Sequence, residues 1–155
     1  MENPDLDLID RSIVRILQRQ ADIGQAALAE KVGASPTSCW RRIRRMEAMG
    51  VLGPAVRLVD PGAVGRDLNV FCHIRLKEHN RHIRREFEHF IESHEEVIEC
   101  YSMSGEWDYL LRVVVKDMRG YERLLMEHFL IHEAVATSSS SFALKQVKYT
   151  TALPI

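Results

Sequence analysis

The order of periodic segments between residues 68 and 144 constrains the fold of this chain more than any other feature. Apolar and polar side chains alternate along residues 68–77, which predicts a strand with one buried face. The later segments with helical or strand-like periodicity are residues 81–92, 97–103, 108–115, 118–130 and 134–144. Their order, β-α-β-β-α-β, predicts a ferredoxin-like split βαβ sandwich whose four-stranded sheet has helices on one face only.

The other face of that sheet needs a cover. Val113 and Val115 alternate to one side of the third predicted strand, and we expect them to make this uncovered face apolar. A second copy of the chain is the simplest cover, because two identical faces related by a two-fold axis complement one another. The sequence therefore predicts a homodimer at minimum.

A basic amphipathic helix concentrates positive charge in the first third of the chain. Ser35 suits the N-cap, Pro36 suits the first helical position, and Gly50 suits the position just past the last turn. The whole chain has 21 Lys and Arg against 22 Asp and Glu, so its total charge does not favour a polyanion partner. The segment Arg41–Arg45 nevertheless concentrates arginine, which indicates contact with double-stranded DNA rather than a solvated surface helix.

A helical wheel predicts which face of this helix packs and which face meets DNA. Cys39, Trp40, Ile43 and Met46 form one apolar stripe, and we expect Trp40 to pack against the first helix of the domain. Side chains near the N-terminus of such a helix reach base edges, whereas many other contacts go to phosphates. The predicted DNA-binding residues are Thr37, Ser38, Arg41 and Arg42 for base readout, Arg44 and Arg45 for phosphates, and Ser35 beside them.

Two further helical patterns precede the basic helix and complete a helix-turn-helix. They span residues 6–20 and 25–32, and Gly33 supplies the turn before the basic helix. The predicted fold class is α+β, with an N-terminal winged helix-turn-helix domain at residues 1–52. A linker at 53–66 and a ferredoxin-like ligand-binding and oligomerisation domain at 67–155 follow. We expect short strands at Ala55–Val59 in the linker and at Gln146–Thr150 in the tail.

Taken together, these motifs resemble those of the Lrp/AsnC family of transcription regulators. The segments that carry the resemblance are Leu6–Gln18, Leu28–Val51 and Ser104–Leu110, in the family's order. The resemblance implies a DNA-binding module joined to an effector module, with dimers that assemble further into tetramers or octamers. It also implies that small amino acids bind at clefts between subunits and change assembly or DNA affinity. Ser141–Pro154 is similar to a branch that includes regulators of cysteine catabolism, which makes cysteine the leading effector candidate.

The same resemblance implies that Gly105 and Asp108 line the amino-acid site. A zwitterion needs acceptors for its ammonium group and donors for its carboxylate, which Asp108, turn N–H groups and serine hydroxyls can supply. The serine-rich run at residues 137–141 fits a strand or a flexible loop, and we expect the strand. The predicted effector-binding residues are Met103, Ser104, Gly105, Trp107, Asp108, Tyr109, Thr137, Ser139 and Ser141.

Several other functions lack a pattern in this sequence. Three cysteines without paired spacing give no zinc motif, and we expect His128 and His132 to be solvated rather than metal ligands. No nucleophile–base set or glycine-rich phosphate loop is present, so we expect neither an enzyme nor a cofactor. Without a signal peptide or an apolar run of about 18 residues, we expect a cytoplasmic protein with no membrane contact. The alternative function is an effector-independent, nucleoid-type DNA-binding protein.

Overall fold

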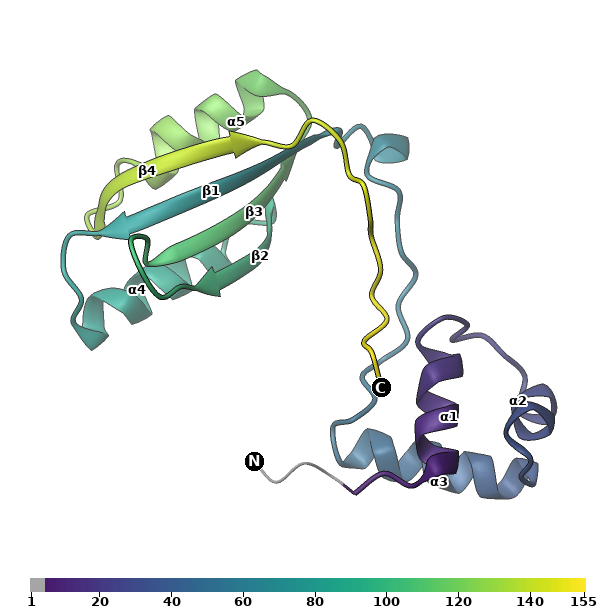
Figure 1. Ribbon diagram of the computed structural model, residues 1–155. Coiled ribbons are helices and arrows are strands. Elements are labelled where there is room, and N and C mark those ends of the chain that lie inside the picture. Colours follow the sequence, from purple (N-terminus) through teal and green to yellow (C-terminus); the bar gives the residue numbers. More distant parts are fainter. Residues whose placement is uncertain (1–4) are drawn as a thin grey trace. The chain divides into compact units, whose positions relative to one another are not determined.

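The computed structural model describes residues 5–155, which divide into two compact units (Figure 1). The N-terminal unit contains residues 5–57 and the segment 148–155, whereas the C-terminal unit contains residues 58–147. The predicted division into 1–52, 53–66 and 67–155 stays a prediction; in the structure, the segment 148–155 lies with the N-terminal helices. Residues 1–4 of the predicted first domain lie outside the described residues.

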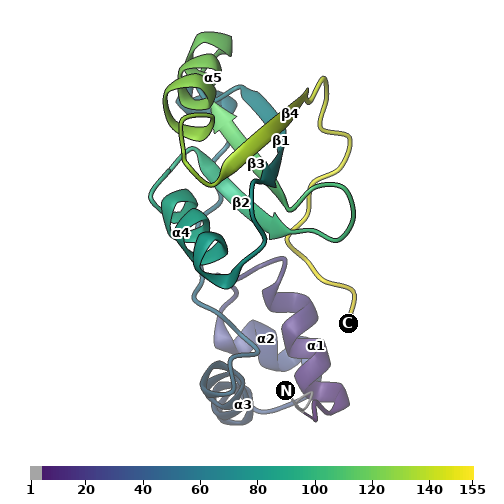
Figure 2. The same cartoon turned by 90° about the vertical axis from the view of Figure 1, so that its left-hand side faces the viewer.

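Three helices form the N-terminal unit: α1 (Leu8–Leu17), α2 (Gln25–Val32) and α3 (Pro36–Ala48) (Figures 1 and 2). Each helix contributes side chains to one apolar core, and Ile13, Leu28, Cys39 and Met46 are almost completely removed from solvent. The predicted helix-turn-helix is confirmed, with α1 three residues shorter at its C-terminal end than expected.

Local sequence determines both ends of α3. The Ser35 hydroxyl accepts a hydrogen bond from the backbone N–H of Ser38 at 3.2 Å, and Pro36 is the first helical residue. Beyond the last turn, Gly50 has φ 71°, a conformation that favours glycine. The N–H of Val51 then donates to the Met46 carbonyl at 2.8 Å, which satisfies a helix-terminal acceptor. The predicted start and stop of the basic helix are confirmed.

The C-terminal unit is the predicted βαββαβ sandwich. Its elements are β1 (Leu68–Leu76), α4 (Arg81–Glu92), β2 (Val97–Ser102), β3 (Tyr109–Val115), α5 (Met118–Leu124), a turn of π-helix (Leu125–Phe129) and β4 (Val135–Phe142). The sheet has the strand order β2-β3-β1-β4 with antiparallel neighbours, and α4 and α5 cover one face (Figure 2). No helix within residues 5–155 has the length and apolar character needed to cross a bilayer.

The two faces of the sheet carry different side chains from those expected for β3. Val113 and Val115 are buried beneath the helices and do not line the uncovered face, so that expectation is wrong. Register explains the correction, because Val113 pairs with Val70 of the buried alternation in β1. The helix-free face is formed by the other set of side chains, including Phe71, His73, Arg75, Leu110 and Arg112.

Two short strands expected outside the sandwich do not form within residues 5–155. Ala55–Val59 and Gln146–Thr150 are extended but have no strand beside them, and a strand needs a hydrogen-bonded neighbour. The linker instead contains one 3₁₀ turn at Gly62–Val64. Both segments have the alternation of a strand, which sets side-chain direction but supplies no partner.

The segment 148–155 docks on α1 of the N-terminal unit. The Gln18 amide pairs with the backbone of Leu153, accepting its N–H at 2.6 Å and donating to its carbonyl at 3.3 Å. Arg15 Nε donates to the Ile155 carbonyl oxygen at 2.6 Å, and the Ile155 side chain packs against the helical core. The chain therefore connects the two units twice, before residue 58 and after residue 147.

We expect Gln18→Ala to release this segment without unfolding α1. The variant loses both amide hydrogen bonds to Leu153, which should lower the free energy of unfolding of the unit by about 1 kcal/mol. Gln20→Ala is the matched control, because the Gln20 side chain is exposed and hydrogen-bonds to none of residues 5–155. Amide hydrogen exchange measures the effect: faster exchange at Leu153 only in Gln18→Ala supports this docking, and equal protection in both variants contradicts it.

Candidate DNA-contact surface and effector site

Helix α3 buries a different arc of its surface from the one that the wheel predicts. Cys39 and Met46 are completely buried, Ile43 is half-buried, and Trp40 is 47% exposed. On a wheel of about 100° per residue, the centre of burial lies about 50° from Ile43, toward Arg42. The expectation that Trp40 packs against the first helix is therefore wrong. The exposed arc carries Thr37, Trp40, Arg41 and Arg44.

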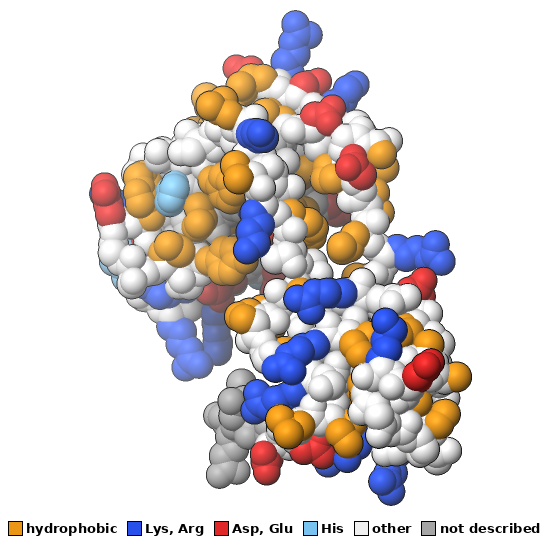
Figure 3. All heavy atoms as spheres, turned by 45° about the vertical axis from the view of Figure 1, so that its right-hand side comes forward, with side chains coloured by type: hydrophobic (Ala, Val, Ile, Leu, Met, Phe, Trp, Pro, Cys, Tyr) orange, Lys and Arg blue, Asp and Glu red, His pale blue; other side chains and the backbone are white. Residues whose placement is uncertain are grey.

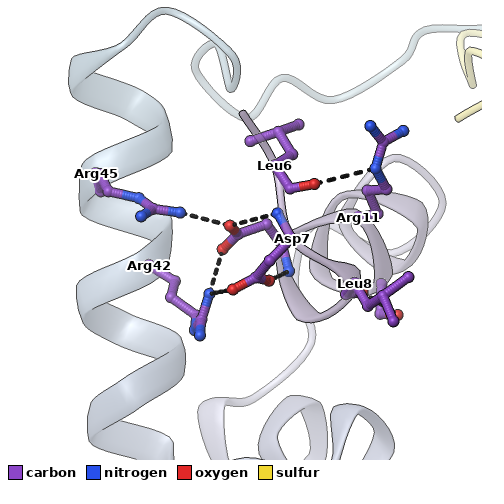
Figure 4. A network of polar contacts seen from close by, with 8 residues as sticks. Leu6, Asp7, Leu8, Arg11, Arg42 and Arg45 are labelled. Carbon is purple, nitrogen blue, oxygen red and sulfur yellow. Dashed lines mark hydrogen bonds and ion pairs between the residues drawn. The ribbon is translucent and has the colours of Figure 1, made fainter. Parts of the chain in front are cut away.

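Because the buried arc of α3 is shifted toward Arg42, this residue enters an ion-pair network with α1 (Figure 4). Arg42 Nη1 lies 2.6 Å from Asp7 Oδ2 and 2.8 Å from Asp10 Oδ1, and Arg45 Nη2 lies 2.5 Å from Asp10 Oδ2. Asp10 is the completely buried member, with no exposed side-chain surface. Both arginines reach from α3 to the start of α1, so the network fixes how the two helices pack.

The two aspartates also cap α1, which explains their positions. Asp7 is the N-cap and accepts the Asp10 N–H at 2.8 Å, while Asp10 accepts the Asp7 N–H at 3.2 Å. The hydrogen bond from the Asp10 N–H and the Arg42 guanidinium lower the pKa of Asp7. The same carboxylates, Asp10 first, raise the pKa of Arg42. Asp7 and Arg42 each stabilise the charged form of the other.

Arg42 is thus not available for base readout, which corrects the prediction for this residue. Its side chain is only 21% exposed, and its guanidinium is committed to two carboxylates. Arg45 shares Asp10 but keeps half of its side chain exposed, which leaves room for a phosphate contact. We call these contacts of Asp7 and Asp10 with Arg42 and Arg45 the Asp10 clamp. Its signal in the sequence is a pair of acids at the start of α1 together with an unusually basic helix.

The remaining predicted DNA residues divide into exposed and structural positions. Thr37 and Arg41 are exposed, and Arg41 pairs with no carboxylate among residues 5–155. Arg44 is held in place, because it bonds Glu47 at 3.0 Å and lies over the Trp40 ring at 5.7 Å. Ser35 serves as the helix cap, while Ser38 is half-buried at the edge of the exposed arc.

The second candidate site begins at the turn between β2 and β3. Gly105 has φ 107°, where a side chain would be strained, so glycine is required at this turn. The Met103 N–H donates to the Asp108 carbonyl at 2.8 Å, and the Asp108 N–H donates to the Ile74 carbonyl at 2.9 Å. The turn, with Ser104 at its start, is therefore anchored against the end of β1.

A polar and aromatic cluster stands beside this turn on the helix-free face. Arg75 Nε and Nη2 donate to the Glu106 carbonyl and carboxylate, both at 3.0 Å, and its guanidinium lies 5.2 Å from the Trp107 ring. His73 lies 5.7 Å from the same ring. The polar positions of β1 were the available signal for His73 and Arg75, which the site prediction omitted.

Alternate hydroxyl side chains of β4 lie on the same face of the sheet as this cluster. Thr137 pairs with Arg75, Ser139 with His73 and Ser141 with Phe71, so these three hydroxyls share the helix-free face with the cluster. The run at residues 137–141 is a strand, as expected. The structure therefore brings Trp107 and the alternate hydroxyls of β4 to one face, with β1 between them.

Two predicted effector residues have other tasks. Asp108 Oδ2 accepts the Leu76 N–H at 2.8 Å, and Oδ1 lies 3.0 Å from His79 Nδ1 and 3.8 Å from Arg84. Its carboxylate thus holds the turn to β1. The prediction that Tyr109 binds the effector is wrong, because its side chain lies in the core under the helices and its hydroxyl donates to Glu88 at 2.8 Å. Burial raises the pKa of the Tyr109 phenol, which stays protonated.

A cavity of about 320 Å³ lies elsewhere, between α4 and β2. Its lining includes Glu88, Glu92, Glu99 and Cys100, so a carboxylate ligand would meet like charge there. Burial, with Glu88 nearby, raises the pKa of Cys100 to about 11, and the thiol is protonated at neutral pH. This cavity suits neither an amino-acid carboxylate nor thiolate chemistry. Within residues 5–155, no three metal-ligating side chains converge.

Two known domains match the sequence. Residues 6–52 match the winged helix-turn-helix DNA-binding domain, and residues 69–153 match the Lrp/AsnC ligand binding domain. Together these matches cover both units.

Similar proteins match over almost the whole chain. The DNA-binding transcriptional activator DecR of Escherichia coli strain K12 is 37% identical over 150 residues, covering 97% of this chain and 99% of that protein. The leucine-responsive regulatory protein of the same strain is 35% identical over 151 residues, covering 97% and 92%.

Solved structures give the same result for the fold. An AsnC family transcriptional regulator from Agrobacterium tumefaciens aligns with a TM-score of 0.91 at 44% identity, covering 96% of this chain and 97% of that one. A transcriptional regulator from Neisseria meningitidis, solved as an L-Met complex, aligns with a TM-score of 0.93 at 31% identity, covering 97% of each chain.

We expect Arg42→Ala and Arg41→Ala to differ in their effect on stability. Without Arg42, the buried Asp10 carboxylate keeps Arg45 as its one cationic partner among residues 5–155, which should lower the free energy of unfolding of the N-terminal unit by about 2–3 kcal/mol. Arg41→Ala should change it by less than about 0.5 kcal/mol, because Arg41 is exposed. Urea unfolding of the full chain, followed by helical circular dichroism, measures both; equal losses would contradict the clamp.

Proposed function

The chain belongs to the Lrp/AsnC family of DNA-binding transcriptional regulators, and we propose that within this family it responds to a small amino acid. The effector changes either its assembly or its DNA affinity. The observation that carries the proposal is that one chain has both an exposed basic arc on α3 and a polar and aromatic cluster on the helix-free sheet face. The named relatives are regulators, which supports a non-enzymatic role.

Helix α3 supports sequence-specific readout in this proposal. Thr37 and Arg41 are exposed polar residues in the first half of this helix, where side chains meet base edges. Arginine binds guanine O6 and N7 in a bidentate manner, and a free guanidinium such as that of Arg41 is required for this. Arg44 and Arg45 contact phosphates. Because its ligand is chromosomal DNA, we place the protein in the cytoplasm.

The helix-free sheet face supports a homodimer. It exposes the apolar or aromatic side chains Phe71 and Tyr101, at 37% and 52%, next to Leu110 and Val114. Figure 3 shows hydrophobic side chains gathered over this face, and basic side chains on the N-terminal unit. A dimer carries two copies of α3 and would bind two half-sites. We propose that such dimers assemble further, into tetramers or octamers.

The effector in this proposal is a free amino acid bound beside the Trp107 cluster. Arg75 and the hydroxyls of Thr137 and Ser139 supply donors for its carboxylate, while backbone carbonyls of the turn accept from its ammonium group. One similar regulator was solved with L-Met and another is named leucine-responsive. Cysteine stays a prediction from the tail resemblance alone.

A second candidate is an effector-independent, nucleoid-type DNA-binding protein. It is favoured by one observation: Asp108 Oδ2 already accepts the Leu76 N–H and Oδ1 lies beside His79 and Arg84, so both oxygens of this carboxylate are occupied. Binding of genomic fragments, selected with and without added amino acids, separates the two candidates. A regulator changes its set of bound fragments when the amino acid is added, and a nucleoid protein does not.

We expect Arg41→Ala to relax base preference and Arg44→Ala to preserve it. Losing a bidentate guanine contact should lower affinity for a selected fragment about tenfold or more, with a smaller loss on random DNA. Losing a phosphate contact should lower both affinities equally and reduce the salt slope by about 0.9. Fluorescence anisotropy on both DNAs measures this; equal losses for Arg41→Ala would make it a phosphate contact.

We also expect Ser139→Ala to weaken binding of the amino acid that the wild type prefers among L-methionine, L-leucine and L-cysteine. The loss of one hydroxyl donor corresponds to about five- to tenfold in affinity. Ser138→Ala is the matched control, because Ser138 pairs with the buried Ile74 and its side chain faces the helices. Calorimetry on the full chain that shows unchanged affinity in Ser139→Ala would overturn the site.

A further inference from the structure

Trp40 is a large apolar side chain on the face of α3 that is otherwise polar and basic. It is 47% exposed and takes no part in the apolar core of the N-terminal unit. It lies in the first half of α3, one helical turn after Pro36, and shares the exposed arc with Thr37 and Arg41. The indole therefore stands beside the residues proposed for base readout.

Single exposed hydrophobic side chains are ordinary on protein surfaces, so exposure alone carries no role. The position of Trp40 adds the argument. Because α3 is rotated by the Asp10 clamp, the indole turns out of the core and into the base-reading arc. Its apolar surface remains in water until a partner covers it, and covering that surface is favourable.

The neighbours of Trp40 are also arranged for a DNA groove. The Arg44 guanidinium lies 5.7 Å from the indole centroid and bonds Glu47 at 3.0 Å, so the cation is held beside the ring. The proposed phosphate contact of Arg44 would bring the indole, one turn earlier on the same helix, close to the base edges. The major groove presents one apolar group there, the 5-methyl of thymine.

We propose that Trp40 is a specificity-determining residue that reads thymine through its 5-methyl group. The inference rests on the proposed DNA readout by α3 and adds a base that arginine contacts do not select. Trp40 makes an apolar contact, whereas Arg41 reads guanine by hydrogen bonds. The recognised half-site therefore contains a thymine whose methyl group, rather than its hydrogen-bonding edge, matters for affinity.

Deoxyuridine tests this proposal, because it removes only the methyl group. A fragment selected from genomic DNA is resynthesised with each thymine replaced singly, and affinities are measured for the full-length wild type, Trp40→Ala and Trp40→Phe. At one thymine in each half-site, replacement should weaken wild-type binding about fourfold, the value of one buried methyl group. The same replacement should change Trp40→Ala binding less than twofold, and Trp40→Phe should retain part of the discrimination.

Three outcomes overturn the proposal. They are Trp40→Ala binding as tightly as the wild type, every deoxyuridine costing both proteins equally, and no deoxyuridine weakening the wild type. Leu8→Ala is the matched control, since Leu8 is an apolar side chain on α1 that is 82% exposed. Arg41→Ala and Arg44→Ala distinguish failure of the DNA readout by α3 from failure of the Trp40 proposal. If neither variant changes DNA binding, the readout by α3 is wrong. If both lose affinity but no methyl effect is seen, only the role of Trp40 is rejected.

Discussion

The DNA-binding unit depends on the ion pairs that the buried Asp10 carboxylate makes with Arg42 and Arg45. A completely buried carboxylate is costly unless it is paired, and Asp10 is paired with Arg42 and Arg45 of α3 while also capping α1. One side chain thus completes the cap of the first helix with Asp7 and fixes the rotation of the third. That rotation decides which residues of α3 face the solvent, and so which can face DNA.

The clamp divides a run of similar arginines into different roles. Arg42 pairs with Asp7 and Asp10, and Arg45 also pairs with Asp10 but stays half exposed. Arg41 and Arg44 are presented outward, with Trp40 just before Arg41 in sequence and at the flank of the same arc. A basic helix is therefore only partly a DNA-binding surface. Part of its charge neutralises the acids of its own domain, which is why the local charge count overstates the number of DNA contacts.

Sequence patterns predicted the elements well but not the rotation of α3 or the partners of extended segments. Strand alternation and helix caps identified the βαββαβ order and the ends of α3, because both depend on neighbouring residues. Arg42 and Trp40 were misplaced because a wheel contains no information on which side a neighbouring helix offers a counter-ion. The sheet face of Tyr109 and Val113 depends on strand register, which alternation alone does not give. The segments 55–59 and 146–150 are extended but have no neighbouring strand, and a local pattern does not say whether a strand will find one.

A crystal structure of the full chain bound to a selected genomic fragment tests the clamp most directly. We predict that Arg42 keeps its contacts to Asp7 and Asp10 in the complex, while Thr37, Trp40 and Arg41 lie against base edges. Arg42 released from Asp10 and hydrogen-bonded to a base, with Trp40 turned into the helical core, would contradict it.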